Sequence, residues 1–400
     1  MGKKIRALEN LKVLDLTRVV AGPYCTAILG DMGAKVIKIE IPGKGDDSRA
    51  YDPHVNGESV YFANLNRNKI GITLNLKHPK GKEIFLQLVK KADVVVENFR
   101  PGVMDKLGIG YDVLKEVNDQ IIYAAVSGFG SYGPYSQRPG YDIISQAMGG
   151  LMSVTGPEGS PPTRSGNAMG DILGGMNLAI GILAAVNARH LIGHGQRVDV
   201  SLVDSVVASL ENAFERYLYS GMLPKRMGNS YASIAPYDSY RAKDGYVIIA
   251  CGNQKLYEKF CTEVIHMPEM ITDKRFATIP LRVKNNKIQK QYIESWTTKH
   301  TVDEVVDLAL SKGIPAGPIY DLKQIIEDEH ISKAREMFLD VDHPVIGKMK
   351  VNGNPIKLMD TMPDVQMPAP TLGQDNDYVY GEILKMSKQE IKDLSKNGVI

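Results

Sequence analysis

The 400-residue sequence contains few cysteines, no marked excess of either charge and no long uninterrupted hydrophobic run. Its three cysteines, Cys25, Cys251 and Cys261, lack Cys-x-x-Cys spacing. This argues against a structural zinc site or a disulfide framework and predicts buried thiols in a reducing compartment. The 48 Lys and Arg residues nearly balance the 46 Asp and Glu residues. Without a strong positive charge, the chain lacks the electrostatic signature of a nucleic-acid-binding protein.

The apolar tract at 178–192 is interrupted by Asn187, Arg189 and His190. It is therefore predicted to be a buried helix, too short to span a bilayer. The first ten residues are basic but lack the apolar core of a signal peptide, and Arg6 stands where a myristoylation signal needs Ser or Thr. We expect a cytoplasmic protein with neither a nucleic acid nor a membrane as partner.

The first two hundred residues alternate β-rich runs with segments of helical periodicity, which predicts an α/β fold with a parallel sheet and right-handed crossovers. The expected strands are rich in Val and Ile and are bounded by Gly, Pro or Asp, at 12–16, 35–40, 70–76, 93–98 and 121–126. The expected helices cover 79–92 and 203–218. In such sheets, ligands bind beyond the carboxyl ends of the strands.

The length favours two domains. Residues 1–224 form the first part of a large Rossmann-like domain in this interpretation, and 225–325 form a smaller α+β domain. The stretch at 221–240, rich in Gly, Pro, Ser and Tyr, is expected to be a linker or an active-site loop. Capping boxes predict helix starts at Thr301 and Ser387, and residues 326–400 return to the large domain.

One glycine motif points toward a dinucleotide. Residues 127–133 contain Gly-x-Gly-x-x-Gly after an expected strand. A dinucleotide fingerprint must open a helix, so that the pyrophosphate meets the helix N-terminus. The following segment, 134–140, begins and ends with Pro-Tyr and Pro-Gly and cannot start one. The motif is therefore not interpreted as a dinucleotide-binding site.

The most informative segment is 163–201, where a polar loop delivers Asp171 to the mouth of an apolar helix. The local pattern alone favours an N-cap role for Asp171. An N-cap residue could also act as a nucleophile, because the helix dipole would hold a carboxylate there ionised and available for reaction.

Five sequence blocks occur in the order found in one enzyme family. They are 11–40, 93–102, the Asp171 segment, 193–201 and 369–373. Nearly the whole chain thus resembles the family III CoA-transferases, which include formyl-CoA and carnitine CoA-transferases. The resemblance implies a homodimer of interlinked rings, no prosthetic group or metal, and an acyl-CoA and a small carboxylic acid as substrates.

The resemblance also implies the catalytic route. Asp171 would be the nucleophile, passing through an aspartyl-acyl anhydride and an aspartyl-CoA thioester. The implied CoA contacts are Val20 and Ala21 near the thiol, and Leu74, Lys77, Asn98, Phe99, Arg100 and Lys106 along the rest, while Tyr141 would contact the acyl or pantetheine group. For Lys77 and Lys106 the alternative is a solvated surface lysine.

Several positions depart from the formyl-CoA transferase pattern. Val20 replaces a glutamine, Ile41 replaces an arginine, and the segment around Gly228–Ser233 lacks the glycine run that covers the reactive carboxylate there. These changes favour an acceptor with an apolar body, for example an (R)-2-hydroxy acid such as 2-hydroxyisocaproate, the type of acid activated in amino-acid fermentation.

Two other functions stay open at this point. The related α-methylacyl-CoA racemases carry a histidine base where this chain has Tyr141, and a phenol is a poor base at neutral pH. A non-catalytic CoA-binding subunit would keep the groove but would not depend on Asp171 for activity.

Overall fold

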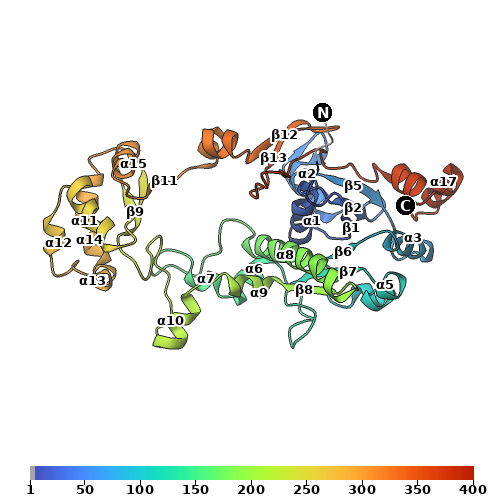
Figure 1. Cartoon of the computed structure of the whole chain (residues 1–400), viewed down its shortest axis with the longest axis horizontal. Coiled ribbons are helices and arrows are strands. Elements are labelled where there is room, and N and C mark those ends of the chain that lie inside the picture. Colours follow the sequence, from blue (N-terminus) through green and yellow to red (C-terminus); the bar gives the residue numbers. More distant parts are fainter. Residues whose placement is uncertain (1–4) are drawn as a thin grey trace. The chain divides into compact units, whose positions relative to one another are not determined.

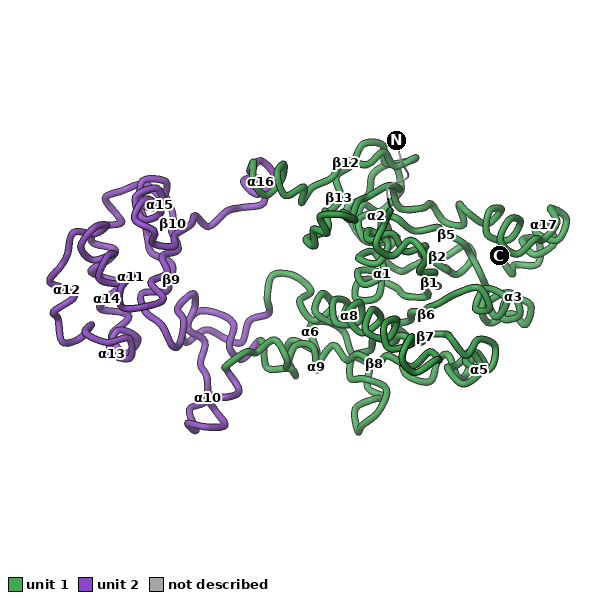
Figure 2. The backbone as a smooth tube through the Cα atoms, in the orientation of Figure 1, with its two compact units in different colours: residues 1–151, 165–212, 329–400 green, residues 152–164, 213–328 purple. Residues whose placement is uncertain are grey.

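The computed structural model describes residues 5–400 and divides them into two compact units (Figures 1 and 2). The larger unit comprises 5–151, 165–212 and 329–400, and the smaller one comprises 152–164 and 213–328. The smaller unit thus includes 213–224, which the sequence assigns to the large domain. Residues 1–4, part of the N-terminal stretch considered above as a signal peptide, lie outside the described residues.

The larger unit is built on a six-stranded parallel sheet with the strand order β5-β2-β1-β6-β7-β8. The order reverses between β1 and β6, as in the Rossmann fold, so the predicted α/β class is confirmed. The expected strands form within a few residues of their predicted bounds. The strands are β1 Lys12–Asp15, β2 Lys35–Glu40, β5 Lys69–Thr73, β6 Val94–Glu97, β7 Ile122–Ser127 and β8 Arg197–Ser201.

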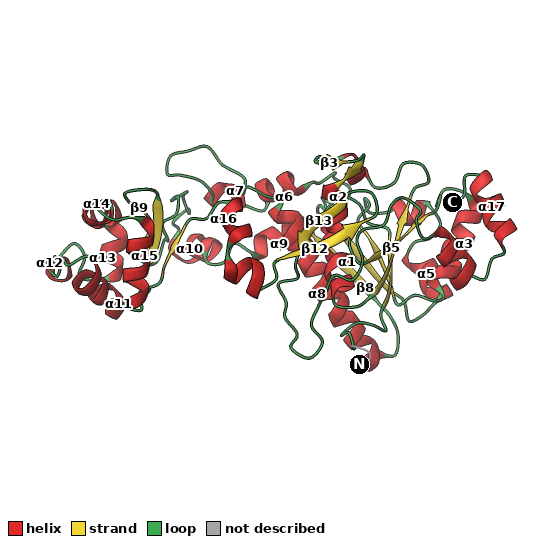
Figure 3. Ribbon diagram, turned by 90° about the horizontal axis from the view of Figure 1, so that it is seen from above, coloured by secondary structure: helices red, strands yellow, loops and turns green. Residues whose placement is uncertain are grey.

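Helices cover both faces of this sheet (Figure 3). Alternating strand residues point to opposite faces, so Leu14 and Ile37 pack with α3, α5 and α17, while Val13 and Val36 pack with α1, α8 and α9. The helices of this unit are α1 Ala21–Asp31, α2 Val60–Leu65, α3 Pro79–Val89, α4 Val103–Lys106, α5 Tyr111–Val117, α6 Asp142–Met148, α8 Met169–Ile192, α9 Leu202–Ala208 and α17 Lys388–Lys396.

Short elements complete the larger unit. They are the hairpins β3 His54–Val55 with β4 Glu58–Ser59 and β12 Phe338–His343 with β13 Gly347–Asn352, and the short helices η1 Asp47–Ala50, η3 Glu329–Ala334 and η4 Asp377–Ile383. Helix α7, Leu151–Val154, crosses the boundary between the units.

The smaller unit packs helices against a three-stranded antiparallel sheet. Its strands are β9 Tyr237–Arg241, β10 Tyr246–Ala250 and β11 Ala316–Pro318. Its helices are α10 Ala213–Ser220, α11 Gln254–Lys259, η2 Phe260–Val264, α12 Glu269–Thr272, α13 Ile279–Lys284, α14 Asn286–Thr297, α15 Val302–Ser311 and α16 Leu322–Glu327. The capping boxes at Thr301 and Ser387 both form, as predicted.

The single helix predicted for 203–218 is wrong, because two helices, α9 and α10, occupy this segment. Between them, Glu211 takes a left-handed backbone conformation with φ of 52°. The Ser209 hydroxyl donates to the Val206 carbonyl oxygen at 2.7 Å, so a side chain satisfies a backbone group at the end of α9.

Helix α8 is longer than the apolar tract suggested. Its 24 residues are long and apolar enough to cross a membrane by length and composition, which corrects the prediction that the tract is too short. A core helix of a globular protein passes the same test. Leu178 and Ile182 are fully buried against the sheet and α1, which is consistent with that interpretation.

Candidate active site

A pocket of about 520 Å³ opens at the carboxyl edge of the large sheet. The chain segments that follow four neighbouring strands supply its lining. They are 16–18 after β1, 39–46 around the end of β2, 74–77 after β5 and 99–107 after β6. Parallel strands bring their carboxyl ends to one edge, and for this reason segments far apart in the sequence meet there.

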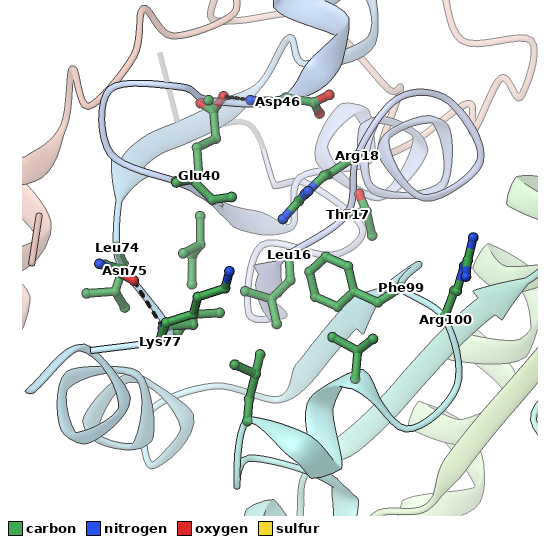
Figure 4. Close-up of a pocket in the computed structure, with 16 residues that line it drawn as sticks. Leu16, Thr17, Arg18, Glu40, Asp46, Leu74, Asn75, Lys77, Phe99 and Arg100 are labelled. Carbon is green, nitrogen blue, oxygen red and sulfur yellow. Dashed lines mark hydrogen bonds between the residues drawn. The ribbon is translucent and has the colours of Figure 1, made fainter. Parts of the chain in front are cut away.

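The pocket combines apolar walls with cationic side chains. Leu16, Leu74 and Phe99 supply apolar surface. Arg18 and Lys77 direct their charged ends toward the same space, and Arg100 lies on the other side of Phe99 (Figure 4). Such a site fits a ligand with a flat apolar portion and anionic groups.

Two carboxylates also line the pocket, but both are paired with cations. Glu40 accepts from Nε and Nη2 of Arg49, each at 2.8 Å. Asp46 forms a fully buried ion pair with Lys38 at 2.8 Å. Lys38 and Ser48 together lower the pKa of Asp46 despite the opposing effect of its burial. The acidic residues are thus neutralised, which leaves Arg18, Lys77 and Arg100 to set the sign of the potential.

The turn from β1 to α1 is held in a strained conformation. Val19 has φ of 67°, a region that β-branched residues rarely adopt. The Val19 N–H donates to Asp46 Oδ1 at 3.1 Å. Asn98 receives the Arg18 N–H and donates to the Arg18 carbonyl oxygen, both at 2.8 Å. These hydrogen bonds hold the turn in its strained conformation, as is typical of strained backbone at a functional site.

The start of α1 lies directly against α8. Val20 and Ala21 are buried. A Cβ atom placed on Gly175 would lie 2.5 Å from the Ala21 carbonyl oxygen, so only glycine permits this approach. A Cβ atom on Gly174 would lie 2.5 Å from the end of the Leu202 side chain of α9, so this glycine allows close packing of α8 against α9. Gly175 brings the second turn of α8 close to the start of α1.

Asp171 is the third residue of α8 and does not cap it. The N-cap position is Ala168, which makes no side-chain capping hydrogen bond. The N-cap role favoured by the local pattern is therefore wrong, because the helix begins two residues earlier than Asp171. Within residues 5–400, no hydrogen bond reaches the Asp171 carboxylate. Its oxygen atoms are left available for a reacting group.

Helix α6 positions the segment that carries Asp171. The Gly170 N–H donates to Asp142 Oδ1 at 2.8 Å. Gln146, fully buried, donates to Asp142 Oδ2 at 2.9 Å and accepts the Ser165 N–H at 3.0 Å. The polar loop before α8 is therefore fixed by two side chains of α6, which orients Asp171 beside them.

The electrostatic surroundings of Asp171 disfavour its charged form. Burial, and secondly the charge of Asp142, raise the pKa of Asp171 to about 7. The helix N-terminus acts in the opposite direction. The prediction that the dipole keeps this group fully ionised is therefore wrong, because desolvation and a like charge outweigh it. A perturbed carboxyl of this kind is typical of an active site.

Tyrosines gather near this carboxyl. Burial and the charges of Asp171 and Asp142 raise the pKa of Tyr61. The ring of Tyr51 meets that of Tyr61 edge to face, with centroids 5.6 Å apart. Burial, and secondly the charge of Asp47, raise the pKa of Tyr51, and Tyr141 adds to this shift. The region around Asp171 is thus aromatic and anionic, in contrast to the cationic pocket.

The predicted contact residues divide into several groups. Leu74, Lys77, Phe99 and Arg100 line the pocket together. Asn98 lies behind the pocket wall and holds Arg18. Lys106 is exposed on α4 and is not among the lining residues, although Val103 and Leu107 of the same segment are. Tyr141 is 76% exposed and lies on the Asp171 side rather than in the pocket.

Sequence reasoning missed three residues that the structure places at these two regions, namely Arg18, Asp142 and Tyr61. Arg18 directly follows β1, so the rule that ligands bind at strand ends could have identified it. Asp142 and Tyr61 gave no such signal, because their proximity to Asp171 depends on how α6 and α2 pack.

No helix begins between the end of β7 and Asp142, which confirms that the glycine motif does not open a helix. A Cβ atom on Gly128 would lie 2.7 Å from Gly140 Cα. Glycine at this position therefore lets the two ends of the loop 128–140 approach each other closely. All three cysteines are free and buried, also as predicted. Across the part of the chain that the structure describes, no group of three His, Cys, Asp or Glu side chains could hold a metal ion.

Comparison with known proteins gives a consistent result. Residues 8–376 match the model of CoA-transferase family III. The chain is 38% identical to succinyl-CoA:glutarate CoA-transferase of Mus musculus, covering 99% of this chain and 91% of that protein. It is 42% identical to acetyl-CoA:oxalate CoA-transferase of Acetobacter aceti, covering 88% of each. A crystal structure of a CaiB/BaiF family protein from Brucella suis matches with a TM-score of 0.83, at 38% identity over 94% of this chain and 99% of that one.

Proposed function

The chain belongs to CoA-transferase family III, and from this premise we propose that Asp171 is the nucleophile that carries the acyl group and then CoA. The enzyme transfers CoA between an acyl-CoA and a carboxylic acid. The observation that carries the proposal is a partly buried carboxyl with a pKa of about 7 and no hydrogen-bond partner among the described residues.

The proposed reaction has four exchanges at three carbonyl carbons, those of the donor, of the Asp171 side chain and of the acceptor. An Asp171 oxygen attacks the thioester carbonyl of the donor, the C–S bond breaks, and the CoA thiolate leaves an aspartyl-acyl anhydride. The thiolate attacks the aspartyl carbonyl and releases the donor acid, forming an aspartyl-CoA thioester. The acceptor carboxylate attacks this thioester and again releases the thiolate. The thiolate then attacks the acceptor carbonyl, which gives the new acyl-CoA and restores Asp171.

The raised pKa of Asp171 suits this role. A carboxylate that is poorly solvated and faces Asp142 is a stronger nucleophile than one stabilised by hydrogen bonds or a cation. A group with a pKa of about 7 is still about half ionised at neutral pH. The same surroundings would destabilise the resting enzyme slightly. This electrostatic cost disappears when the carboxylate becomes a neutral anhydride or thioester.

We assign the cationic pocket to the nucleotide end of CoA. Its volume of about 520 Å³ and its apolar walls suit an adenine ring. Arg18, Lys77 and Arg100 supply charge for phosphate groups. The pantetheine arm would then pass the strained turn at Val19 toward the junction of α1 and α8, where Val20 and Ala21 lie.

For the acceptor, the relatives and the sequence point to different acids. The relatives are named for glutarate and oxalate, which are dicarboxylic acids. The apolar replacement at Val20, and the rings of Tyr51 and Tyr61, favour an acid with an apolar body. Ile41 lines the pocket assigned to CoA, so its replacement bears on that pocket instead. We propose a small carboxylic acid as acceptor and take glutarate and 2-hydroxyisocaproate as the two acids that discriminate these cases.

We also propose that the enzyme is a homodimer. One stripe of α8 is apolar and solvent-exposed in the single chain, with Met176, Ile180 and Leu191 at 43%, 63% and 82% exposure. Exposed apolar stripes of this kind usually contact another chain. Light scattering at micromolar concentration should give twice the mass of one chain.

The decisive experiment traps the adduct. The enzyme is mixed with succinyl-CoA, acetyl-CoA or formyl-CoA and each candidate acid, quenched within milliseconds and digested, and the peptides are mapped by mass spectrometry. We expect new acyl-CoA and a thioester or anhydride mass on the peptide that contains Asp171. Turnover with the adduct on another residue would contradict the nucleophile assignment. CoA binding without any transfer would favour the non-catalytic alternative.

A further inference from the structure

A buried glutamate lies behind the wall of the CoA pocket. Glu97 is the last residue of β6 and is 6% exposed. Its two oxygens have different partners. Oε2 accepts the Phe99 backbone N–H at 2.6 Å, and Oε1 accepts the Tyr123 hydroxyl at 2.9 Å. No ion pair with Glu97 occurs among residues 5–400, so the carboxyl is held by neutral donors alone.

The segment that Glu97 holds separates two cavities. Phe99 lines both the CoA pocket and a second pocket of about 280 Å³. Val103 of α4 faces the CoA pocket, while Asp105 of the same helix faces the second pocket, which also contains Glu97. The turn at 98–100 and α4 therefore form a wall, and Glu97 contacts this wall from the side opposite to CoA.

Residues of this wall also form hydrogen bonds with the strained turn after β1. Asn98 makes two hydrogen bonds to the backbone of Arg18, each 2.8 Å long. The Arg18 guanidinium lies 5.1 Å from the centre of the Phe99 ring. The position of residues 98–100 therefore sets the position of Arg18, which is one of the cations directed into the pocket (Figure 4).

A buried carboxyl without a cationic partner is unfavourable for folding, and a glutamine or an apolar side chain would avoid this cost. Proteins accept such local conflicts mainly at functional sites. We propose that Glu97 is a positioning residue for CoA, because by accepting the Phe99 N–H it fixes the turn at 98–100 and with it Arg18. This inference rests on the assignment of the neighbouring pocket to CoA.

The charge state of Glu97 gives the inference a second readout. Burial raises the pKa of Glu97 to about 7, against the opposing effects of the Phe99 N–H, Tyr123 and Arg197. The charge of Asp105 acts in the same direction as burial, and Asp199 lines the same pocket from β8. A charged acceptor binds the Phe99 N–H more strongly than a neutral one. The turn should therefore be held better as pH rises through about 7.

The test measures CoA binding by calorimetry on the full-length enzyme at pH 8. Glu97→Ala should weaken binding about tenfold, while Glu97→Gln, which keeps an acceptor oxygen, should stay within about threefold of wild type. The matched control is Asp199→Asn. It removes a carboxylate from the same pocket, but Asp199 accepts the Ser131 N–H rather than holding the turn at 98–100. Its CoA affinity should not change.

Steady-state kinetics add a readout that a purely structural role would not affect. Glu97→Ala should raise KM for acyl-CoA about tenfold and leave kcat and KM for the acceptor acid nearly unchanged. Equal CoA affinity in wild type and Glu97→Ala would overturn the inference, and so would an equal loss in Asp199→Asn or in Glu97→Gln.

If Glu97→Ala does not fold, the near-isosteric Glu97→Gln decides the question through its pH dependence. Between pH 6 and pH 8, CoA affinity of the wild type should rise about two- to threefold more than that of Glu97→Gln, because only the wild type gains a charge. Identical pH profiles would overturn the inference. Wild type that binds no CoA would instead contradict the proposed function on which the inference rests.

Discussion

The pocket that we assign to CoA and the Asp171 region differ in the charges that surround their acidic residues. In the pocket, Glu40 and Asp46 are each paired with a buried or half-buried cation, so that other cations remain for a ligand. Near Asp171, burial and secondly the carboxylate of Asp142 raise the pKa of Asp171 to about 7. One region is built to bind anions tightly, whereas the other keeps an anion unstable and therefore reactive. Substitutions in the two regions should consequently have separable effects on KM and kcat.

The largest effect is expected from Asp171→Ala. Loss of the nucleophile should lower kcat by at least ~1,000-fold, because no other described group replaces a covalent carrier. CoA-ester binding should stay within about tenfold of wild type, since the lost interaction is made mainly during the reaction. Stopped-assay kinetics and calorimetry on the same preparation check both values. Full turnover by Asp171→Ala would show that Asp171 is not the nucleophile, and the contrast between a binding region and a reactive region would then fail.

The next effect concerns pH. Only ionised Asp171 attacks, so kcat/KM should fall about tenfold per unit as pH drops below about 7. Asp142→Asn removes the like charge but keeps an oxygen to accept the Gly170 N–H. It should therefore move the midpoint to lower pH by about one unit. The pH–rate profiles of the two proteins measure this shift. An unchanged midpoint would show that Asp142 does not tune the nucleophile.

A smaller effect is expected in the pocket. Lys77→Ala should raise KM for acyl-CoA about tenfold and leave kcat within about twofold, because a charged contact to phosphate is lost before any chemistry begins. Lys80→Ala is the matched control, since Lys80 lies three residues further and pairs with Glu83 at 2.8 Å. It should leave KM unchanged. A loss of kcat in Lys77→Ala would mean that the two regions are not separable.

The smallest effect is on stability. The folded-state pKa of Asp171 lies above its unfolded value, so stability from this group is present below about pH 4 and is lost as pH rises through about 7. Asp171→Asn should therefore unfold at higher denaturant concentration at pH 8, by ~2 kcal/mol, and match wild type near pH 4. Equal stability of both proteins at pH 8 would contradict the electrostatic description of this site.

Much of the pocket that we assign to CoA could be predicted from the sequence. Leu74, Lys77, Phe99 and Arg100 follow β5 and β6, and the alternation of strands and helices already placed such residues at one edge. Lys106 was expected there as well, but it is exposed on α4, because the helix turns its Val103 face toward the pocket. A resemblance between blocks identifies a segment, whereas the side of a one-turn helix depends on packing.

The surroundings of Asp171 could be predicted less well. The segment was identified as important, but the local pattern favoured Asp171 as the N-cap, a position that Ala168 occupies, and the helix dipole was expected to hold the carboxylate ionised. Both errors have one cause. The contact of Gly170 with Asp142 and that of Ser165 with Gln146, and the burial of Asp171, arise from packing of α8 and its preceding loop against α6. The spacing of apolar residues within either segment gives no information about that contact.

The sequence by itself determined the parallel α/β sheet, the capped helices and the family, since these follow from local patterns of apolar residues, turn residues and motif order. Tertiary structure decided the electrostatics. Whether Asp46 is neutralised by Lys38, whether Asp171 meets a like charge in Asp142, and whether Glu97 holds the pocket wall all depend on distances between segments. Coulomb and desolvation energies vary with separation and burial, and neither quantity is encoded locally.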